Sequence, residues 1–144
     1  MANYISVFAA DFEACTLMPD YSDQIIAHFE RPRNVGRIPD ADGLGEQSDP
    51  TCGDFLKVWI KVSNACIVDI RFQCRGCPTA IATASIMTEL ARGQTLSQAQ
   101  RITPADICRA AGGLPPGKDH CSNLAAQTLQ RAIACYRDSR GEPS

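Results

Sequence analysis

Residues 55–73 read FLKVWIKVSNACIVDIRFQ, and apolar side chains recur at every second position along most of this stretch. A period of two residues is typical of β-strands that are buried on one face. The pattern is interrupted at Ser63 and Asn64, as it would be at a tight turn, so the stretch predicts a β-hairpin. The expected apolar face of the hairpin consists of alternate residues: Leu56, Val58, Ile60, Val62, Cys66, Val68, Ile70 and Phe72.

The chain before the hairpin predicts one helix and a less regular segment. We expect the helix over residues 21–30, capped by Ser22 or by the chain before it and ended by the Arg31–Pro32 pair. Residues 34–51 are rich in Gly, Pro and Asp, which indicates a loop or an irregular edge strand.

The chain after the hairpin is predicted to be helical. Pro78 suits the first position of a helix of small residues that ends near Gly93, and Thr103 suits the cap of the next helix. A last, long helix is indicated by an apolar stripe with three- and four-residue spacing: Leu124, Ala125, Thr128, Leu129, Ala132, Ile133 and Tyr136.

Length and composition predict a single domain. We assign residues 1–20 to an N-terminal extension, residues 21–138 to one globular domain and residues 139–144 to a tail, with fraying from Arg137 onward. The net charge is -2. Because electrostatic capture of nucleic acid requires a clear basic excess, we expect no nucleic-acid partner. Apolar runs are shorter than the roughly 18 residues that span a bilayer, so we expect no membrane partner.

The chain contains eight cysteines, a smaller share than in small secreted disulfide scaffolds. The N-terminus lacks the basic region of a signal peptide, and Asp11 and Glu13 argue against an organellar transit peptide. We therefore expect a reducing, cytoplasmic location, where clustered cysteines more often serve metal or sulfur chemistry.

Three of these cysteines lie where predicted elements begin. Cys52 precedes the first strand of the hairpin, Cys77 precedes the small-residue helix, and Cys121 lies at the start of the last helix. The positive end of a helix favours thiolate over thiol. If the strand extends back far enough, Asp54 shares its face with the apolar residues. Together with His120, these residues predict a pocket of three thiolates, a carboxylate and an imidazole.

This set of donors suits a soft metal. Thiolates favour iron–sulfur clusters or Zn²⁺. An oxygen or nitrogen donor in place of a fourth cysteine should weaken the hold on a soft iron site, which is useful to a protein that gives its cluster away.

Several motifs resemble the IscU/NifU scaffold proteins of iron–sulfur cluster assembly, most closely the N-terminal domain of NifU. The resemblance extends from about Tyr21 to Tyr136. The matching motifs are Tyr21–Asp23, Arg31–Gly36, Thr51–Asp54, Arg75–Ala82 and Gly113–Ser122.

The resemblance implies a fold and a set of site residues. The family fold is α+β, a small three-stranded antiparallel sheet with helices packed on one face. Cys52, Cys77 and Cys121 match the cluster-binding cysteines of the family, Asp54 matches the aspartate associated with cluster release, and His120 matches a residue that can bind the metal or the cluster.

The resemblance also implies a non-enzymatic scaffold or carrier. Cys121 would receive sulfur as a persulfide from a cysteine desulfurase, Fe²⁺ and electrons would follow, and a transient [2Fe-2S] cluster would pass to acceptor apo-proteins. Ferredoxin-like or frataxin-like proteins are further candidate partners, and the expected oligomeric state is a monomer or dimer. Gly117 replaces the valine of the Leu-Pro-Pro-Val-Lys element that docks an Hsp70-type chaperone, which argues against that partner.

Two other functions remain open on the sequence alone. The same donors suit a structural zinc domain that binds partners, and zinc can also occupy the resting form of a scaffold. Cys74 and Cys77 form a C-x-x-C pair that suits a thiol–disulfide oxidoreductase, although a βαβ context is absent.

The other cysteines and the second histidine have simpler interpretations. Cys74 is expected at a strand end, where it can trap Cys77 as a disulfide in air, and Cys15 is unassigned. His28, near the end of the first helix, is expected to be structural. Three cysteines fall in apolar patterns and are predicted to be buried or half-buried: Cys66, Cys108 and Cys135.

Overall fold

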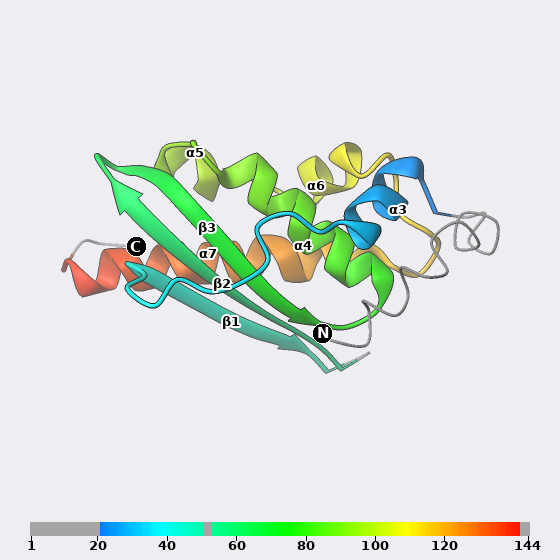
Figure 1. The fold of residues 1–144 in the computed structure, drawn as a ribbon, viewed down its shortest axis with the longest axis horizontal. Helices are drawn as coiled ribbons and strands as arrows, with labels where there is room; N and C mark the ends of the chain where they lie inside the picture. The colour runs from blue at the N-terminus through cyan, green and yellow to red at the C-terminus, as the bar shows by residue number, and fades with distance from the viewer. Residues whose placement is uncertain (1–20, 51–52, 142–144) are drawn as a thin grey trace.

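The structure is a computed structural model of the 144-residue chain, and it describes residues 21–50 and 53–141. Three strands form an antiparallel sheet in the order β1-β2-β3, and helices cover one of its faces (Figure 1). The expected α+β class with this sheet is confirmed. The elements are α3 (Asp23–Glu30), β1 (Gly43–Asp49), β2 (Asp54–Ser63), β3 (Cys66–Arg75), α4 (Pro78–Ala91), α5 (Leu96–Gln100), α6 (Pro104–Ala110) and α7 (Asp119–Ser139).

Strands β2 and β3 form the predicted hairpin, with its turn one residue later than the sequence indicated. Asn64 and Ala65 occupy the turn with φ angles of 53° and 61°. Positive φ at both central residues matches the twist of the strands that such a turn joins.

A β-bulge changes the predicted face of β3. Lys61 pairs with Asp69 but Val62 pairs with Ile67, so Val68 is an extra residue in the ladder. The predicted side chains Ile70 and Phe72 do face the core, but Val68 is 48% exposed and Ile67 is fully buried. The alternation predicted for residues 66–68 was wrong because a bulge reverses the parity of the residues beyond it.

Strand β1 is a regular edge strand that packs directly on α7. A Cβ atom on Gly45 would lie 2.6 Å from the backbone nitrogen of Ala132, and one on Gly43 would clash with the carbonyl oxygen of Ala132. The glycines therefore allow the strand backbone and the helix backbone to touch. This contact places the end of β1 beside the start of α7.

The segment between α3 and β1 crosses the sheet. Val35 forms a parallel bridge with Phe72 at the edge of β3, whereas β1 lies at the opposite edge. The chain crosses the face away from the helices (Figure 1), where Lys61 Nζ donates a hydrogen bond to the Asp40 carbonyl oxygen at 2.8 Å.

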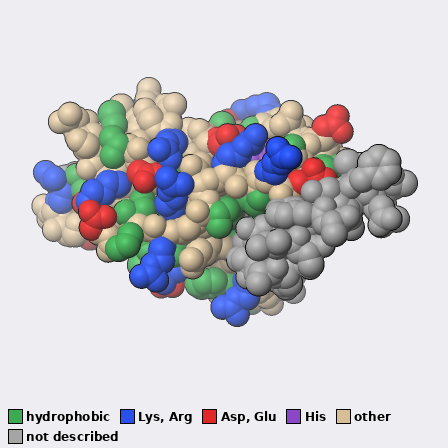
Figure 2. Space-filling view, viewed as in Figure 1, with side chains coloured by type: hydrophobic (Ala, Val, Ile, Leu, Met, Phe, Trp, Pro, Cys, Tyr) green, Lys and Arg blue, Asp and Glu red, His purple; other side chains and the backbone are tan. Residues whose placement is uncertain are grey.

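Acidic and basic side chains are interspersed on the face drawn in Figure 2.

Helix α3 ends at Glu30 as predicted and begins at Asp23, two residues after the predicted start, with Ser22 as its N-cap. The Ser22 side chain accepts a hydrogen bond from the Ile25 N–H, and Arg31 is the C-cap. His28 is 5% exposed, and its Nδ1 lies 2.7 Å from Ser85 Oγ of α4. These contacts agree with a structural role for His28.

The helices after the sheet contain one element that the sequence analysis missed. Helix α5 begins with a capping box formed by Thr95 and Gln98. Helix α6 begins after Thr103, as predicted. Helix α7 continues to Ser139, so the predicted fraying from Arg137 was wrong for the first residues of that segment.

One cysteine lies in a different environment from the predicted one. Cys66 and Cys108 are partly buried, as predicted, whereas Cys135 is exposed. The buried stripe of α7 includes Ala132 and Ile133, and Cys135 lies outside it. The helices in the described part of the chain lack the combined length and apolar character needed to cross a membrane.

Candidate metal centre

Two helix starts and one strand start meet at one end of the sheet. The ligand atoms of Asp54, Cys77 and Cys121 all lie within 4.8 Å of one another, and the two sulfur atoms are 4.0 Å apart. Asp54 begins β2, Cys77 is the N-cap of α4, and Cys121 is in the first turn of α7. The structure therefore brings together three residues that the sequence singled out.

The carboxylate of Asp54 is held on the helix side of the sheet. Asp54 shares this face with Leu56 and is 3% exposed. A Cβ atom on Gly76 would lie 2.6 Å from Asp54 Oδ1. The lack of a side chain at Gly76 thus leaves the space that the buried carboxylate occupies.

Cys77 is the better thiolate of the two neighbouring cysteines. The hydrogen bond from Cys121 is the largest cause that lowers its pKa, to about 5, although burial acts in the opposite direction. The backbone N–H of Ala80, in the first turn of α4, and the nearby Lys118 lower this pKa further. Lys118 Nζ lies 3.7 Å from Cys77 Sγ, and the same contact raises the pKa of Lys118.

Cys121 is the protonated partner in this pair. Its contact with Cys77 raises its pKa, and burial raises it further; the residue is only 1% exposed. The N-cap of α7 is Lys118, so Cys121 is the third residue of the helix rather than its cap. The expectation that the helix start makes Cys121 a thiolate therefore fits Cys77 better in the metal-free protein.

His120 lies at the outer side of this group. Its Nε2 is 3.9 Å from Asp54 Oδ2, and its side chain is 27% exposed. The imidazole is therefore close enough to join the site after a small movement, and it is more accessible than Asp54. The remaining predicted ligand, Cys52, lies outside the described residues, as do Cys15 and the extension over residues 1–20.

A fourth thiol lies near the centre. Cys74 is at the end of β3, as predicted, and is 3% exposed. Burial, followed by the charges of Asp54 and Cys77, raises the pKa of Cys74 to about 12. In a thiol–disulfide oxidoreductase the attacking thiol has a lowered pKa, so the buried Cys74 could serve only as the resolving thiol and Cys77 would have to attack.

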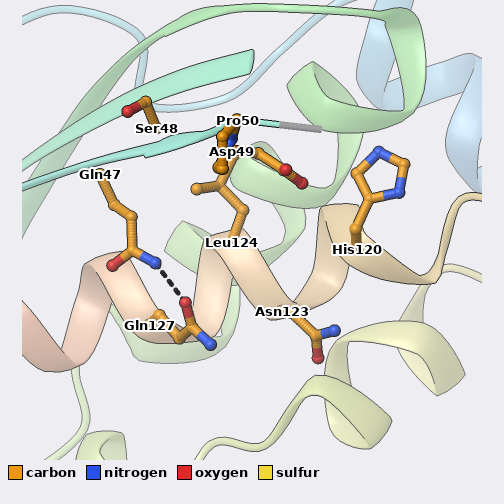
Figure 3. Close-up of a pocket in the computed structure, with 8 residues that line it drawn as sticks. All are labelled: Gln47, Ser48, Asp49, Pro50, His120, Asn123, Leu124 and Gln127. Carbon is orange, nitrogen blue, oxygen red and sulfur yellow. Dashed lines mark hydrogen bonds between the residues drawn. The ribbon is translucent and has the colours of Figure 1, made fainter. Parts of the chain in front are cut away.

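A polar pocket of about 240 Å³ adjoins the centre, between the end of β1 and the first turns of α7. Figure 3 shows that the Asp49 side chain extends toward His120, above Leu124. The sequence analysis did not single out Asp49. Asp49 pairs with Asp54 in the β1–β2 ladder, so Asp49 lies beside a proposed metal ligand. This register follows from the four-residue connection between β1 and β2.

These donors can hold a metal ion. Two sulfurs and one carboxylate within bonding reach of a single point suit Fe²⁺ or Zn²⁺, and His120 is a further donor at the edge. The neighbouring Lys118 would partly balance the negative charge of the thiolates.

The sequence model of the NifU-like N terminal domain family matches residues 20–142. Among characterised relatives, "Iron-sulfur cluster assembly scaffold protein IscU 1" of Archaeoglobus fulgidus is 51% identical over 122 residues, which cover 85% of this chain and 80% of the relative. The IscU scaffold protein of Escherichia coli K12 is 44% identical over 124 residues, covering 83% of this chain and 96% of that protein.

Solved structures share the fold. A crystal structure described as a putative iron–sulfur cluster assembly scaffold protein for the SUF system, from Fervidobacterium islandicum, superposes with a TM-score of 0.69 at 21% identity, covering 81% of this chain and 98% of that chain. A NifU-like protein (N-terminal) from Brucella abortus gives a TM-score of 0.68 at 15% identity, with coverages of 85% and 97%. At these identities the likeness concerns the fold.

Proposed function

This chain belongs to the family of NifU-like N-terminal domains, and we propose that it is a scaffold on which an iron–sulfur cluster is assembled before transfer to acceptor proteins. The observation that carries this proposal is the convergence of Asp54, Cys77 and Cys121, whose ligand atoms lie within 4.8 Å of one another. The names of the relatives support the same role.

The proposed ligands divide into strong and exchangeable donors. Cys77 and Cys121 supply soft sulfur ligands, and we propose Cys52 as the third. Asp54 and His120 would compete for the remaining position, at which oxygen or nitrogen binds soft iron more weakly than thiolate does. Because one position is weakly bound, a [2Fe-2S] cluster could be released to an acceptor through Asp54.

Sulfur would arrive on Cys121 as a persulfide. The Cys121 thiolate attacks the outer sulfur of a desulfurase persulfide, forms the new S–S bond, and releases the desulfurase cysteine as a thiolate. Cys121 gives up its proton in this exchange, and the released desulfurase thiolate can take that proton. The positive charge of the nearby Lys118 favours the Cys121 thiolate. Each transferred sulfur then needs two electrons to become sulfide, which a ferredoxin-like partner would supply.

Anaerobic reconstitution tests this proposal. The full chain is incubated with Fe²⁺, cysteine and a cysteine desulfurase, and visible absorption follows cluster formation. Wild type and the matched control Cys108→Ser, a partly buried cysteine of α6, should form the cluster. Cys121→Ser should lose both the persulfide, detected by mass spectrometry, and the cluster. Equal behaviour of wild type and Cys121→Ser, without cluster absorption, would refute the scaffold role.

A structural zinc site is the second candidate, because the same sulfur and oxygen donors suit a tetrahedral zinc ion. It predicts one tightly held zinc whose removal by a chelator unfolds the protein. A scaffold instead should keep its fold when the metal is removed, since its core is a sheet covered by helices. Circular dichroism before and after chelation distinguishes the two functions.

A further inference from the structure

We propose that Asp49 is the carboxylate that first receives the incoming ferrous ion, and that the pocket beside it is the path by which iron reaches Asp54, Cys77 and Cys121. This inference rests on the proposed function, since it concerns how the substrate iron enters that site.

Asp49 and Asp54 are opposite each other in the β1–β2 ladder. Side chains of opposite residues in antiparallel strands lie on the same face, with Cβ atoms about 5 Å apart. Asp54 faces the helices, so Asp49 faces them as well, on the same side as Gly45, which packs on α7. Figure 3 shows the Asp49 side chain extending toward His120, whose Nε2 is 3.9 Å from Asp54 Oδ2. Asp49 and His120 therefore both neighbour Asp54, the first as its cross-strand partner and the second through the 3.9 Å contact.

Exposure sets the order in which an ion would meet these donors. The Asp54 side chain is 4% exposed, the His120 side chain is 27% exposed, and Asp49 is partly exposed at the wall of the 240 Å³ pocket. A hydrated ion cannot reach Asp54 directly from solvent. It can reach Asp49 and His120, and these in turn adjoin Asp54.

Charge favours the same direction of approach. Lys118 Nζ lies 3.7 Å from Cys77 Sγ, so a positive charge stands at the Cys77 side of the centre and repels a divalent cation. On the other side, the acidic residues Asp49 and Asp54 lie opposite each other in the β1–β2 ladder. An opening lined by one sign of charge raises the local concentration of oppositely charged ions and their association rate.

The order of donors also suits the chemistry of the ion. Hydrated divalent cations bind readily to carboxylate oxygen, and imidazole suits Fe²⁺. Transfer from Asp49 and His120 to Asp54, Cys77 and Cys121 exchanges these donors and the remaining waters for soft sulfur. Asp49 therefore affects how fast the ion arrives, whereas the final ligand set is unchanged.

The experiment measures metal association with the full, reduced chain under anaerobic conditions. Co²⁺ replaces Fe²⁺ as the probe, because thiolate-to-cobalt charge transfer reports arrival at the cysteines in a stopped-flow instrument. Asp49→Asn removes the charge but keeps the size of the side chain. Asp49→Glu restores the charge. Glu46→Gln is the matched control, since Glu46 lies on the same strand but is exposed on the opposite face, 3.5 Å from Lys57.

We expect Asp49→Asn to slow Co²⁺ association about tenfold at low ionic strength, with a smaller effect at high salt. The saturated spectrum and the thermal midpoint should match those of the wild type, and Asp49→Glu should recover most of the rate. Wild-type rates in Asp49→Asn, or equal slowing in Glu46→Gln, would overturn the inference while leaving the metal centre intact. A wild type that shows no charge-transfer band would overturn both this inference and the proposed function.

Discussion

A Cβ atom placed on Gly76 would lie 2.6 Å from Oδ1 of Asp54 and 2.9 Å from its Cγ. The buried carboxylate and any larger residue at position 76 therefore compete for the same space. Because Cys77 follows directly, this one glycine lets the oxygen donor from β2 and the sulfur donor from the start of α4 occupy a common site.

Gly76→Ala should displace the Asp54 carboxylate. Overpacking of this kind costs about 1–3 kcal/mol in the free energy of unfolding, and the displaced ligand should also weaken Co²⁺ binding. Urea unfolding and Co²⁺ titration measure the two effects. In an Asp54→Ala background the cost of Gly76→Ala should shrink, because the two clashing atoms of Asp54 are gone. An equal cost in both backgrounds would contradict this explanation.

Cys77 should react with iodoacetamide before Cys121 and Cys74 in the metal-free protein at pH 6.5. Its pKa of about 5 makes it a thiolate at that pH, whereas the pKa of Cys74 is about 12 and that of Cys121 is raised. We expect a rate more than about tenfold higher, measured by mass spectrometry of the labelled peptides. Lys118→Met should slow labelling of Cys77, because Lys118 lowers its pKa. Earlier labelling of Cys121 would be inconsistent with the assignment.

Thr79→Val should stabilise the metal-free protein. The Thr79 hydroxyl is fully buried and lacks a hydrogen-bond partner. Every other buried side-chain oxygen or nitrogen in the described part of the chain has one. Replacing it with a methyl group of similar size removes an uncompensated desolvation cost, worth about 1 kcal/mol. Thr128→Val is the matched control, since the Thr128 hydroxyl donates to the Leu124 carbonyl oxygen at 2.7 Å and its removal should destabilise. Urea midpoints of the same sign for both variants would count against the prediction.

His28 should make the free energy of unfolding depend on pH. Burial lowers its pKa below the ordinary value of 6.5, and Arg33 lowers it further, although Glu89 acts in the opposite direction. The unfolded chain therefore binds a proton first as pH falls below about 6.5, which destabilises the fold at lower pH. Urea unfolding at pH 7.5 and pH 5.5 should show this loss. In His28→Gln, the decrease in the free energy of unfolding between pH 7.5 and pH 5.5 should be smaller, because this histidine no longer contributes. An unchanged pH dependence in this variant would show that His28 does not cause the decrease.

Local sequence patterns predicted most of the elements and the reactive cysteines, but they missed helix α5 and Asp49. The alternation over residues 55–73 predicted the hairpin, and the caps at Ser22 and Thr103 predicted where two helices begin. These features depend on neighbours within a few residues, so they can be inferred without knowledge of the fold. Pattern alone failed at Val68, where one extra residue in β3 reverses the faces of the strand.

The sequence by itself determined which donors are available, because the chemistry of a thiol, a carboxylate or an imidazole belongs to the residue type. Only the tertiary structure decided that Cys77 lies 4.0 Å from the sulfur of Cys121 and 3.7 Å from Nζ of Lys118, the contacts that lower the pKa of its thiol. These distances join segments far apart in the chain. Such distances are set by how α4 and α7 pack on the sheet, and no local pattern encodes them.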